Sequence, residues 1–157
     1  MNRLGALVAC AFAVGGCGET LIPNTDVEDT DDNRKVIDYC EEYRIALEAR
    51  DVAKLLNMTA DDYYEDGGSP SGHDDYDRAG LEQRLRTRFS RLEAVRYDIR
   101  YRRVVYFPDR VEVYYSYYGR FQVAAQTDGD SLWFSEVGDN RLVLARVPNG
   151  YKILSGL

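Results

Sequence analysis

The sequence predicts an α+β domain, in which helices come first and an antiparallel sheet follows. Two patterns carry this prediction: between residues 33 and 92 apolar residues recur every three or four positions, as in helices. From residue 95 onward they alternate with polar residues, which is the period of a half-buried strand. Because the helices precede the strands, they cannot serve as crossovers of a parallel sheet, and the strands must pair as an antiparallel meander. With 157 residues, 45% of them hydrophobic, the chain suffices for one such domain.

The N-terminal residues match a secretion signal that ends in a lipid-attachment site. One basic residue, Arg3, precedes the uncharged residues 4–14, which are fewer than the ~20 that a membrane-spanning helix needs. The Val-Gly-Gly-Cys sequence that ends at Cys17 resembles the bacterial lipobox. The resemblance implies that residues 1–16 are a lipoprotein signal peptide and that lipid on Cys17 attaches the mature chain to a membrane. An ordinary secretion signal followed by an unrelated cysteine is the alternative.

The residues after this cysteine bear on location and reach. Gly18 stands where an Asp would retain an enterobacterial lipoprotein in the inner membrane, so the resemblance implies an outer-membrane lipoprotein of the bacterial envelope that faces the periplasm. Residues 17–32 comprise the lipidated cysteine and a polar, acidic stretch without periodicity, which predicts a flexible tether. Cys40, in contrast, lies in an apolar helical pattern, which favours a buried and inert thiol.

Three amphipathic helices are expected next. The first covers residues 33–50, a short second one follows a capping Asp51, and a third follows a capping Asp77. Residues 66–77, rich in Gly and Asp, predict a loop between the last two. The residues expected on the buried faces of these helices are Val36, Cys40, Tyr43, Leu47, Val52, Leu55, Leu56, Leu81, Leu85, Phe89 and Leu92.

Five strands are expected after the helices, separated by turns that contain Pro, Gly, Asp or Asn. Gly119 interrupts the longest of them, and a glycine inside a strand often marks a bulge or a sharp bend, as a strongly curved sheet requires. The predicted strands cover residues 95–102, 111–123, 132–137, 141–147 and 151–154.

Two segments resemble the nuclear transport factor 2-like (NTF2-like or SnoaL-like) superfamily. These are Tyr-Arg-Ile-Ala-Leu-Glu-Ala-Arg-Asp-Val at residues 43–52 and Asn-Gly-Tyr-Lys-Ile-Leu-Ser-Gly-Leu at residues 149–157. The resemblance covers residues 33–157 and implies an NTF2-like cone, in which a curved sheet wraps around a long first helix. Members include isomerases and dehydratases as well as catalytically silent binding or assembly domains. They have a short hairpin where this chain has the loop at residues 66–77.

The sequence identifies no catalytic residue, metal ligand or cofactor. The sole histidine, His73, lies in the Gly-rich loop, and no acid is clearly placed on an inward strand face. Its neighbours Asp74, Asp75 and Asp77 lack the alternating spacing and the distal Glu of an EF-hand, which favours a solvated loop. We therefore expect a non-catalytic binding or assembly module. The alternative is a small-molecule carrier, or an enzyme of the isomerase or dehydratase type, that uses the cone pocket.

Three residues are candidates for ligand binding inside the cone. Arg103 is in phase with the inward residues of the strand at 95–102, and its guanidinium could bind a carboxylate or a phosphate there. Tyr115 and Tyr117 fall on the inward face of the next strand. A bulge at residues 102–103 would instead turn Arg103 to solvent, where a charge is less costly.

Two other tyrosines are candidates for a protein interface. Tyr114 and Tyr118 fall on the outer sheet face, where rings with a polar tip suit a contact with a second copy or an envelope protein. The alternative is that neighbouring arginine stems cover both rings.

The charge distribution excludes one class of partner and suggests another. Twenty Lys and Arg against 27 Asp and Glu give a net charge of −7, which argues against nucleic-acid binding. Residues 78–110 nevertheless hold ten arginines and four acids. This block could form a basic face for anionic lipid or an acidic partner, or it could pair with the acidic first helix.

Overall fold

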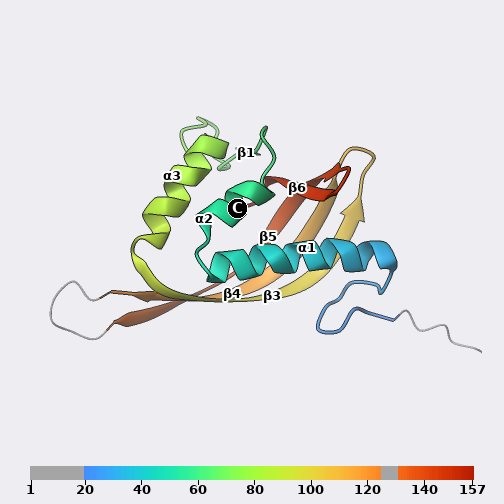
Figure 1. The fold of residues 1–157 in the computed structure, drawn as a ribbon, viewed down its shortest axis with the longest axis horizontal. Coiled ribbons are helices and arrows are strands. Elements are labelled where there is room, and N and C mark those ends of the chain that lie inside the picture. Colours follow the sequence, from blue (N-terminus) through green and yellow to red (C-terminus); the bar gives the residue numbers. More distant parts are fainter. Residues whose placement is uncertain (1–19, 125–130) are drawn as a thin grey trace, which may run out of the picture.

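The computed structural model describes residues 20–124 and 131–157, and within them it confirms the α+β fold class (Figure 1). β3 to β6 form one antiparallel sheet in chain order, and β1 and β2 form a separate two-stranded hairpin. No helix in the described ranges combines the length and apolarity needed to cross a membrane. The elements are α1 (Asp31–Glu48), α2 (Val52–Met58), β1 (Tyr64–Glu65), β2 (Tyr76–Asp77), α3 (Arg78–Phe89), β3 (Leu92–Tyr106), β4 (Val111–Val123), β5 (Leu132–Val147) and β6 (Gly150–Ser155).

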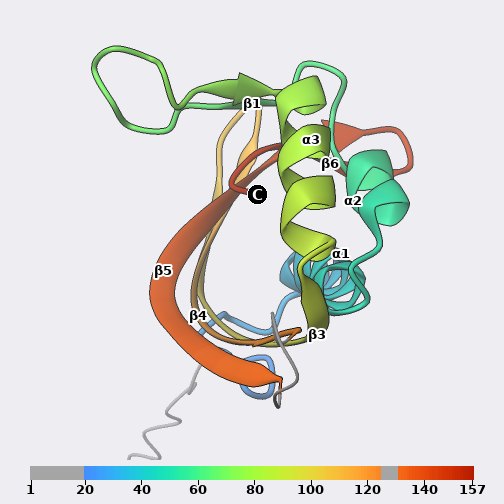
Figure 2. The ribbon, with the colours of Figure 1, turned by 90° about the vertical axis from the view of Figure 1, so that its left-hand side faces the viewer.

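The sheet is strongly curved, and the helices lie on its concave side (Figure 2). α1 lies along this face, and its buried stripe includes Val36, Cys40 and Tyr43. α3 stands beside it and faces β5 across the open side of the cone (Figure 2). The core therefore lies between the apolar stripe of α1 and the inward residues of the strands, such as Val113 and Leu142, which are both fully buried.

The N-terminal segment differs from its sequence prediction. A flexible tether was expected up to Asp32, but residues 20–30 form a folded turn beside β3. The side chain of Val27 is 3% exposed, and the backbone N–H of Asp26 donates to the carbonyl of Tyr101 at 2.9 Å. This segment folds through tertiary contacts with β3, and the periodicity of the local sequence does not report such contacts. Helix α1 also begins two residues earlier than expected, because Thr30 caps it.

β5 is a single strand of 16 residues, whereas two strands were expected from the turn-like sequence Gly-Asp-Asn at residues 138–140. Pairing with β4 continues through this stretch without a shift in register. Gly138 is needed there for its small size, since a Cβ atom would lie 2.9 Å from the hydroxyl of Tyr117. Of the bulge or sharp bend expected at Gly119, the bulge is absent, since the register is unbroken there on both sides. That glycine makes room for the ring of Phe121, which lies 2.7 Å from the position of a Cβ.

The segment between α2 and α3 also needs correction. The sequence placed only a loop at residues 66–77, in departure from the superfamily pattern. In the structure β1 and β2 pair on either side of this loop, with Tyr64 opposite Asp77 and Glu65 opposite Tyr76. The short hairpin is therefore present, and the Gly- and Asp-rich residues form its tip. Asp77 has both roles, since it ends β2 and caps α3.

Candidate functional site

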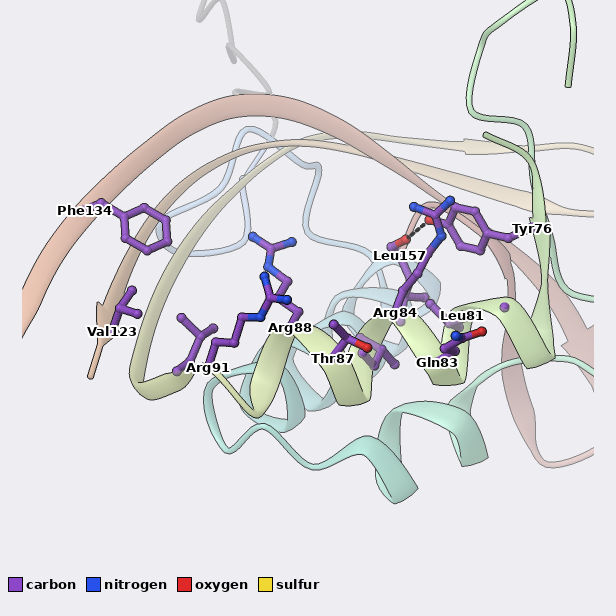
Figure 3. Close-up of a pocket in the computed structure, with 13 residues that line it drawn as sticks. Tyr76, Leu81, Gln83, Arg84, Thr87, Arg88, Arg91, Val123, Phe134 and Leu157 are labelled. Atoms are coloured by element: carbon purple, nitrogen blue, oxygen red, sulfur yellow. Dashed lines mark hydrogen bonds between the residues drawn. The ribbon is translucent and has the colours of Figure 1, made fainter. Parts of the chain in front are cut away.

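A cavity of about 820 Å³ opens between α3 and the concave face of the sheet (Figure 3). Its apolar walls come from both sides: Leu81 and Leu85 from the buried stripe of α3, and Val123 and Phe134 from the paired strands β4 and β5. The wall from the strands is regular, because inward side chains alternate along each strand. Phe134 also stacks on Phe121, with ring centroids 5.1 Å apart.

Three arginines line the same cavity. Arg84 and Arg88 are one turn apart on α3, and Arg91 follows at the end of the helix, so their side chains extend from one side of it (Figure 3). The guanidinium of Arg84 lies 4.2 Å from the ring centre of Tyr76, and that of Arg88 lies 5.0 Å from the ring centre of Phe121. These three arginines add positive charge to a cavity with largely apolar walls, which favours an anionic ligand.

A smaller chamber of about 130 Å³ adjoins this cavity deeper in the cone, and Leu85, Arg88 and Leu157 line both spaces. Its polar centre is Glu136, which projects inward from β5. The hydroxyl of Tyr117 donates to one Glu136 oxygen at 2.8 Å, and a guanidinium nitrogen of Arg88 lies 3.7 Å from the other. Tyr97 stacks on Tyr117, with ring centroids 5.1 Å apart.

The tyrosines of the chamber remain protonated at neutral pH. Burial raises the pKa of Tyr43 to about 12 and also raises the pKa of Tyr97. Burial likewise raises the pKa of Tyr117, and so does its hydrogen bond to Glu136, since ionisation would set two negative charges side by side. The chamber thus offers phenol groups as hydrogen-bond donors and one carboxylate as a proton acceptor.

The structure separates the three predicted ligand-binding residues. The register of β3 against β4 shifts between Tyr101 and Arg103, so this bulge turns Arg103 to the outer face. There its guanidinium lies 4.4 Å from the ring centre of Tyr114, as expected from the alternative of a bulge at residues 102–103, so Arg103 does not point into the cone. Tyr115 is 1% exposed and accepts a hydrogen bond from Asn140 beneath the chamber, whereas Tyr117 lines the chamber itself.

The two predicted interface tyrosines do lie on the outer face. Tyr114 is partly buried under Arg103, and its hydroxyl donates to Glu112 at 2.6 Å. Tyr118 is 41% exposed, with the guanidinium of Arg120 at 5.8 Å from its ring centre. An arginine side chain therefore lies near each ring, as expected from the alternative that arginine stems cover them. Tyr118 is the more exposed of the two tyrosines.

Sequence reasoning missed the polar residues of the cavity. Glu136 was overlooked although it alternates with Leu132 and Phe134 on one face of a predicted strand, a pattern that marks an inward acid once the strand is oriented. The arginines at positions 84 and 88 have the helical spacing of the apolar stripe beside them. In residues 20–124 and 131–157, no three His, Cys, Asp or Glu side chains are grouped to hold a metal ion.

Solved structures of other proteins share this architecture. A protein from Kribbella flavida has a TM-score of 0.66 and 18% identity, over 80% of this chain and 87% of that one. A candidate dehydratase of the NTF2-like family from Streptomyces avermitilis has a TM-score of 0.64 and 16% identity, over 80% and 93%. A candidate aromatic ring hydroxylase from Novosphingobium aromaticivorans has a TM-score of 0.63 and 17% identity, over 81% and 94%.

The sequence by itself gives no such match: no protein-family model and no curated protein matches it. The likeness is one of helix and strand arrangement, at identities where fold persists and site residues differ. On this architecture, the chain has the NTF2-like fold, an α+β cone in which helices pack on a curved antiparallel sheet.

Proposed function

We propose that this chain binds a small amphipathic anion in the cone cavity. The observation that carries the proposal is the cavity of about 820 Å³ with apolar walls and the three arginines Arg84, Arg88 and Arg91. Its volume lies in the range of about 300–1,000 Å³ that small-molecule sites occupy. An apolar or aromatic body would contact Leu81, Val123 and Phe134, while a carboxylate, phosphate or sulfonate would meet the guanidinium groups.

The apolar part and the anionic part of such a ligand would each gain a favourable contact in the cavity. The apolar walls gain from excluding water, at about 25 cal/mol per Å² of apolar surface buried. Within the described ranges, Arg91 makes no ion pair, and Arg88 contacts Glu136 only at 3.7 Å, so both guanidinium groups can bind a further anion. At the level of the fold, the neighbours described as a candidate dehydratase and a candidate ring hydroxylase support a site for small molecules.

The test is a titration with 8-anilinonaphthalene-1-sulfonate, a probe that has an aromatic body and one anionic group. We expect saturable binding of one probe per chain. Arg88→Gln and Arg91→Gln should each weaken it by about 10- to 100-fold, the value of one charge-assisted hydrogen bond of about 1.5–3 kcal/mol. Arg86→Gln is the matched control, because Arg86 pairs with Glu82 on the exposed side of α3. Equal effects of the three variants would contradict the proposal.

The inner chamber favours a second candidate function, an enzyme that moves a proton on the bound ligand. The carboxylate of Glu136 is a proton acceptor that a bound ligand could reach, since the Glu136 side chain is 49% exposed and lines the chamber. Tyr97 and Tyr117 are neutral donors nearby, which suit an oxygen that gains negative charge during an isomerisation or a loss of water. A carrier needs no such acceptor, so the effect of Glu136→Gln on turnover, with binding kept, would separate the two functions.

We also propose that lipid on Cys17 holds this domain to the outer membrane of a bacterial cell, on the periplasmic side. The support is the sequence alone: a short apolar stretch, two small residues, the cysteine and a following Gly18. The cavity would then serve a ligand of the envelope. A second copy or an envelope protein would be the protein partner, with Tyr118 on the outer sheet face as a contact.

A further inference from the structure

Half of β5 is an open edge of the sheet. β4 pairs with β5 from Leu132 to Leu144, but β6 pairs only with residues 143–147 on the other side. Beyond β6, Gly156 lies against the backbone of Arg141. Residues 132–139 therefore have no neighbouring strand on their second side among the described parts of the chain (Figure 2). A free edge presents unpaired backbone N–H and C=O groups, which can pair with another strand.

This edge carries two acids, Glu136 and Asp139, but it lacks other features that usually keep strand edges apart. It contains no proline, lysine or arginine between Leu132 and Asn140, and its unbroken register with β4 excludes a bulge there. Its apolar side chains are exposed on both faces: Leu132 at 72% and Phe134 at 46% on the inner face, Trp133 at 51% and Val137 at 74% on the outer. Tyr118 lies opposite Val137 on β4, so the exposed apolar surface continues from the edge onto the outer face.

We propose that this edge of β5 pairs with the same edge of a second copy of the chain, antiparallel and across a two-fold axis at Ser135. The free stretch is itself centred near Ser135, so two copies can use its full length. Each Trp133 then lies opposite Val137 of the second copy, an aromatic and a β-branched residue on the same face, which is a favourable cross-strand pair. This pair occurs twice, because the interface is isologous.

Charges favour this register over its neighbour. With the axis at Ser135, each Glu136 lies opposite Phe134 of the second copy and each Asp139 opposite Ser131, so no like charges face each other. With the axis at Glu136, the two Glu136 carboxylates would oppose each other, which is destabilising. With the axis at Val137, the second copy would overlap Arg141, where Gly156 already lies. Because residues 132–139 match a second copy of themselves in both side-chain pairs and charge, we infer that the strand added at this edge is that of a second copy.

The pairing would also extend the cavity wall. Phe134 and Glu136 belong both to the free edge and to the lining of the cavity and its inner chamber, so the second copy's strand would continue the concave face beside the mouth. The proposal does not depend on the ligand, since the edge is open whether or not the cavity is filled.

The test measures mass by light scattering on the chain with Cys10→Ser and Cys17→Ser, which cannot carry the lipid. We expect twice the monomer mass for this parent chain and the monomer mass for Val137→Lys. Because Val137 is exposed in the single chain, this substitution should leave the fold of each copy intact. The matched control is Ile45→Lys, at a residue of α1 that is 56% exposed and remote from β5, and it should remain a dimer. In the same background, Ser135→Cys should form a disulfide between copies on oxidation, and Ser71→Cys in the loop should not.

Two outcomes would overturn the proposal. The first is a monomeric parent chain at every concentration tested. The second is a dimer that survives Val137→Lys. If Tyr114→Glu with Tyr118→Glu then abolishes that dimer, the contact belongs to the sheet faces. Circular dichroism of each variant distinguishes loss of pairing from loss of folding.

Discussion

Asp26 fixes the N-terminal segment to the sheet at the level of a single residue. Its carboxylate accepts hydrogen bonds from Arg100 at 2.5 Å and from Arg102 at 2.8 Å. These two guanidinium groups lower the pKa of Asp26 from 3.8 to about 2. The contact explains why part of the arginine-rich block pairs with the segment before α1, and not with the acids of α1 itself.

A pH dependence follows from this contact. Because the pKa of Asp26 is lower in the folded state, its contribution to stability is complete above about pH 4 and is lost as the pH falls towards 2. We expect the melting temperature of Asp26→Asn to fall less steeply than that of the parent chain between pH 4 and 2, measured by thermal unfolding. Asp61→Asn is the control, at an exposed acid with no ion pair among the described residues, and it should follow the parent chain.

The sequence predicted the burial of Cys40 but did not decide the orientation of Arg103, and the difference has a physical reason. Cys40 is fully buried as expected, and burial raises its pKa, because helical periodicity reports directly which face meets the core. For Arg103 the sequence left two orientations open, and the structure has the outward one, because one bulge inserts an extra residue into β3 and reverses the facing of the positions just after it. Which orientation forms depends on how β3 pairs with β4, and the local sequence of β3 does not record this pairing.

At the scale of elements, the starts of α2 and α3 were the most predictable features. Asp51 and Asp77 cap α2 and α3 as expected, since each side chain accepts from a backbone N–H three residues later. β5 was less predictable: Gly138 resembles a turn residue, but its small size accommodates the ring of Tyr117 from β4. The cavity needed still more information, because Arg88 and Glu136 come together only when α3 is placed against β5.

The two caps give a prediction at this scale. Asp51→Ala and Asp77→Ala should each lower the free energy of unfolding by about 1 kcal/mol, because each leaves a first-turn N–H without its side-chain acceptor. Urea unfolding measures both. Asp62→Ala removes an exposed acid outside any helix and should change stability by less than half as much. If the three variants were equally stable, loss of negative charge rather than loss of the caps would account for any effect.

For the whole molecule, the packed N-terminal segment changes how the proposed lipid anchor would hold the domain. The described fold begins at Thr20, and only Gly18 and Glu19 separate it from Cys17 in the sequence. At full extension this spacing reaches about 10 Å, so the anchored domain would stay close to the bilayer. Leu21, which is 48% exposed, would then be among the side chains nearest the lipid.

The anchor itself is tested with the two N-terminal cysteines as a matched pair. In a bacterial host with an outer membrane, Cys17→Ser should move the protein from the membrane fraction to the soluble periplasmic fraction, because the thiol proposed to receive the lipid is lost. Cys10→Ser changes a cysteine within the apolar part of the proposed signal and should leave the protein in the membrane fraction. Cell fractionation with immunoblotting measures both. Several acyl chains hold a protein far more firmly than a single chain, so retention of the Cys17→Ser protein would show that something other than lipid binds it.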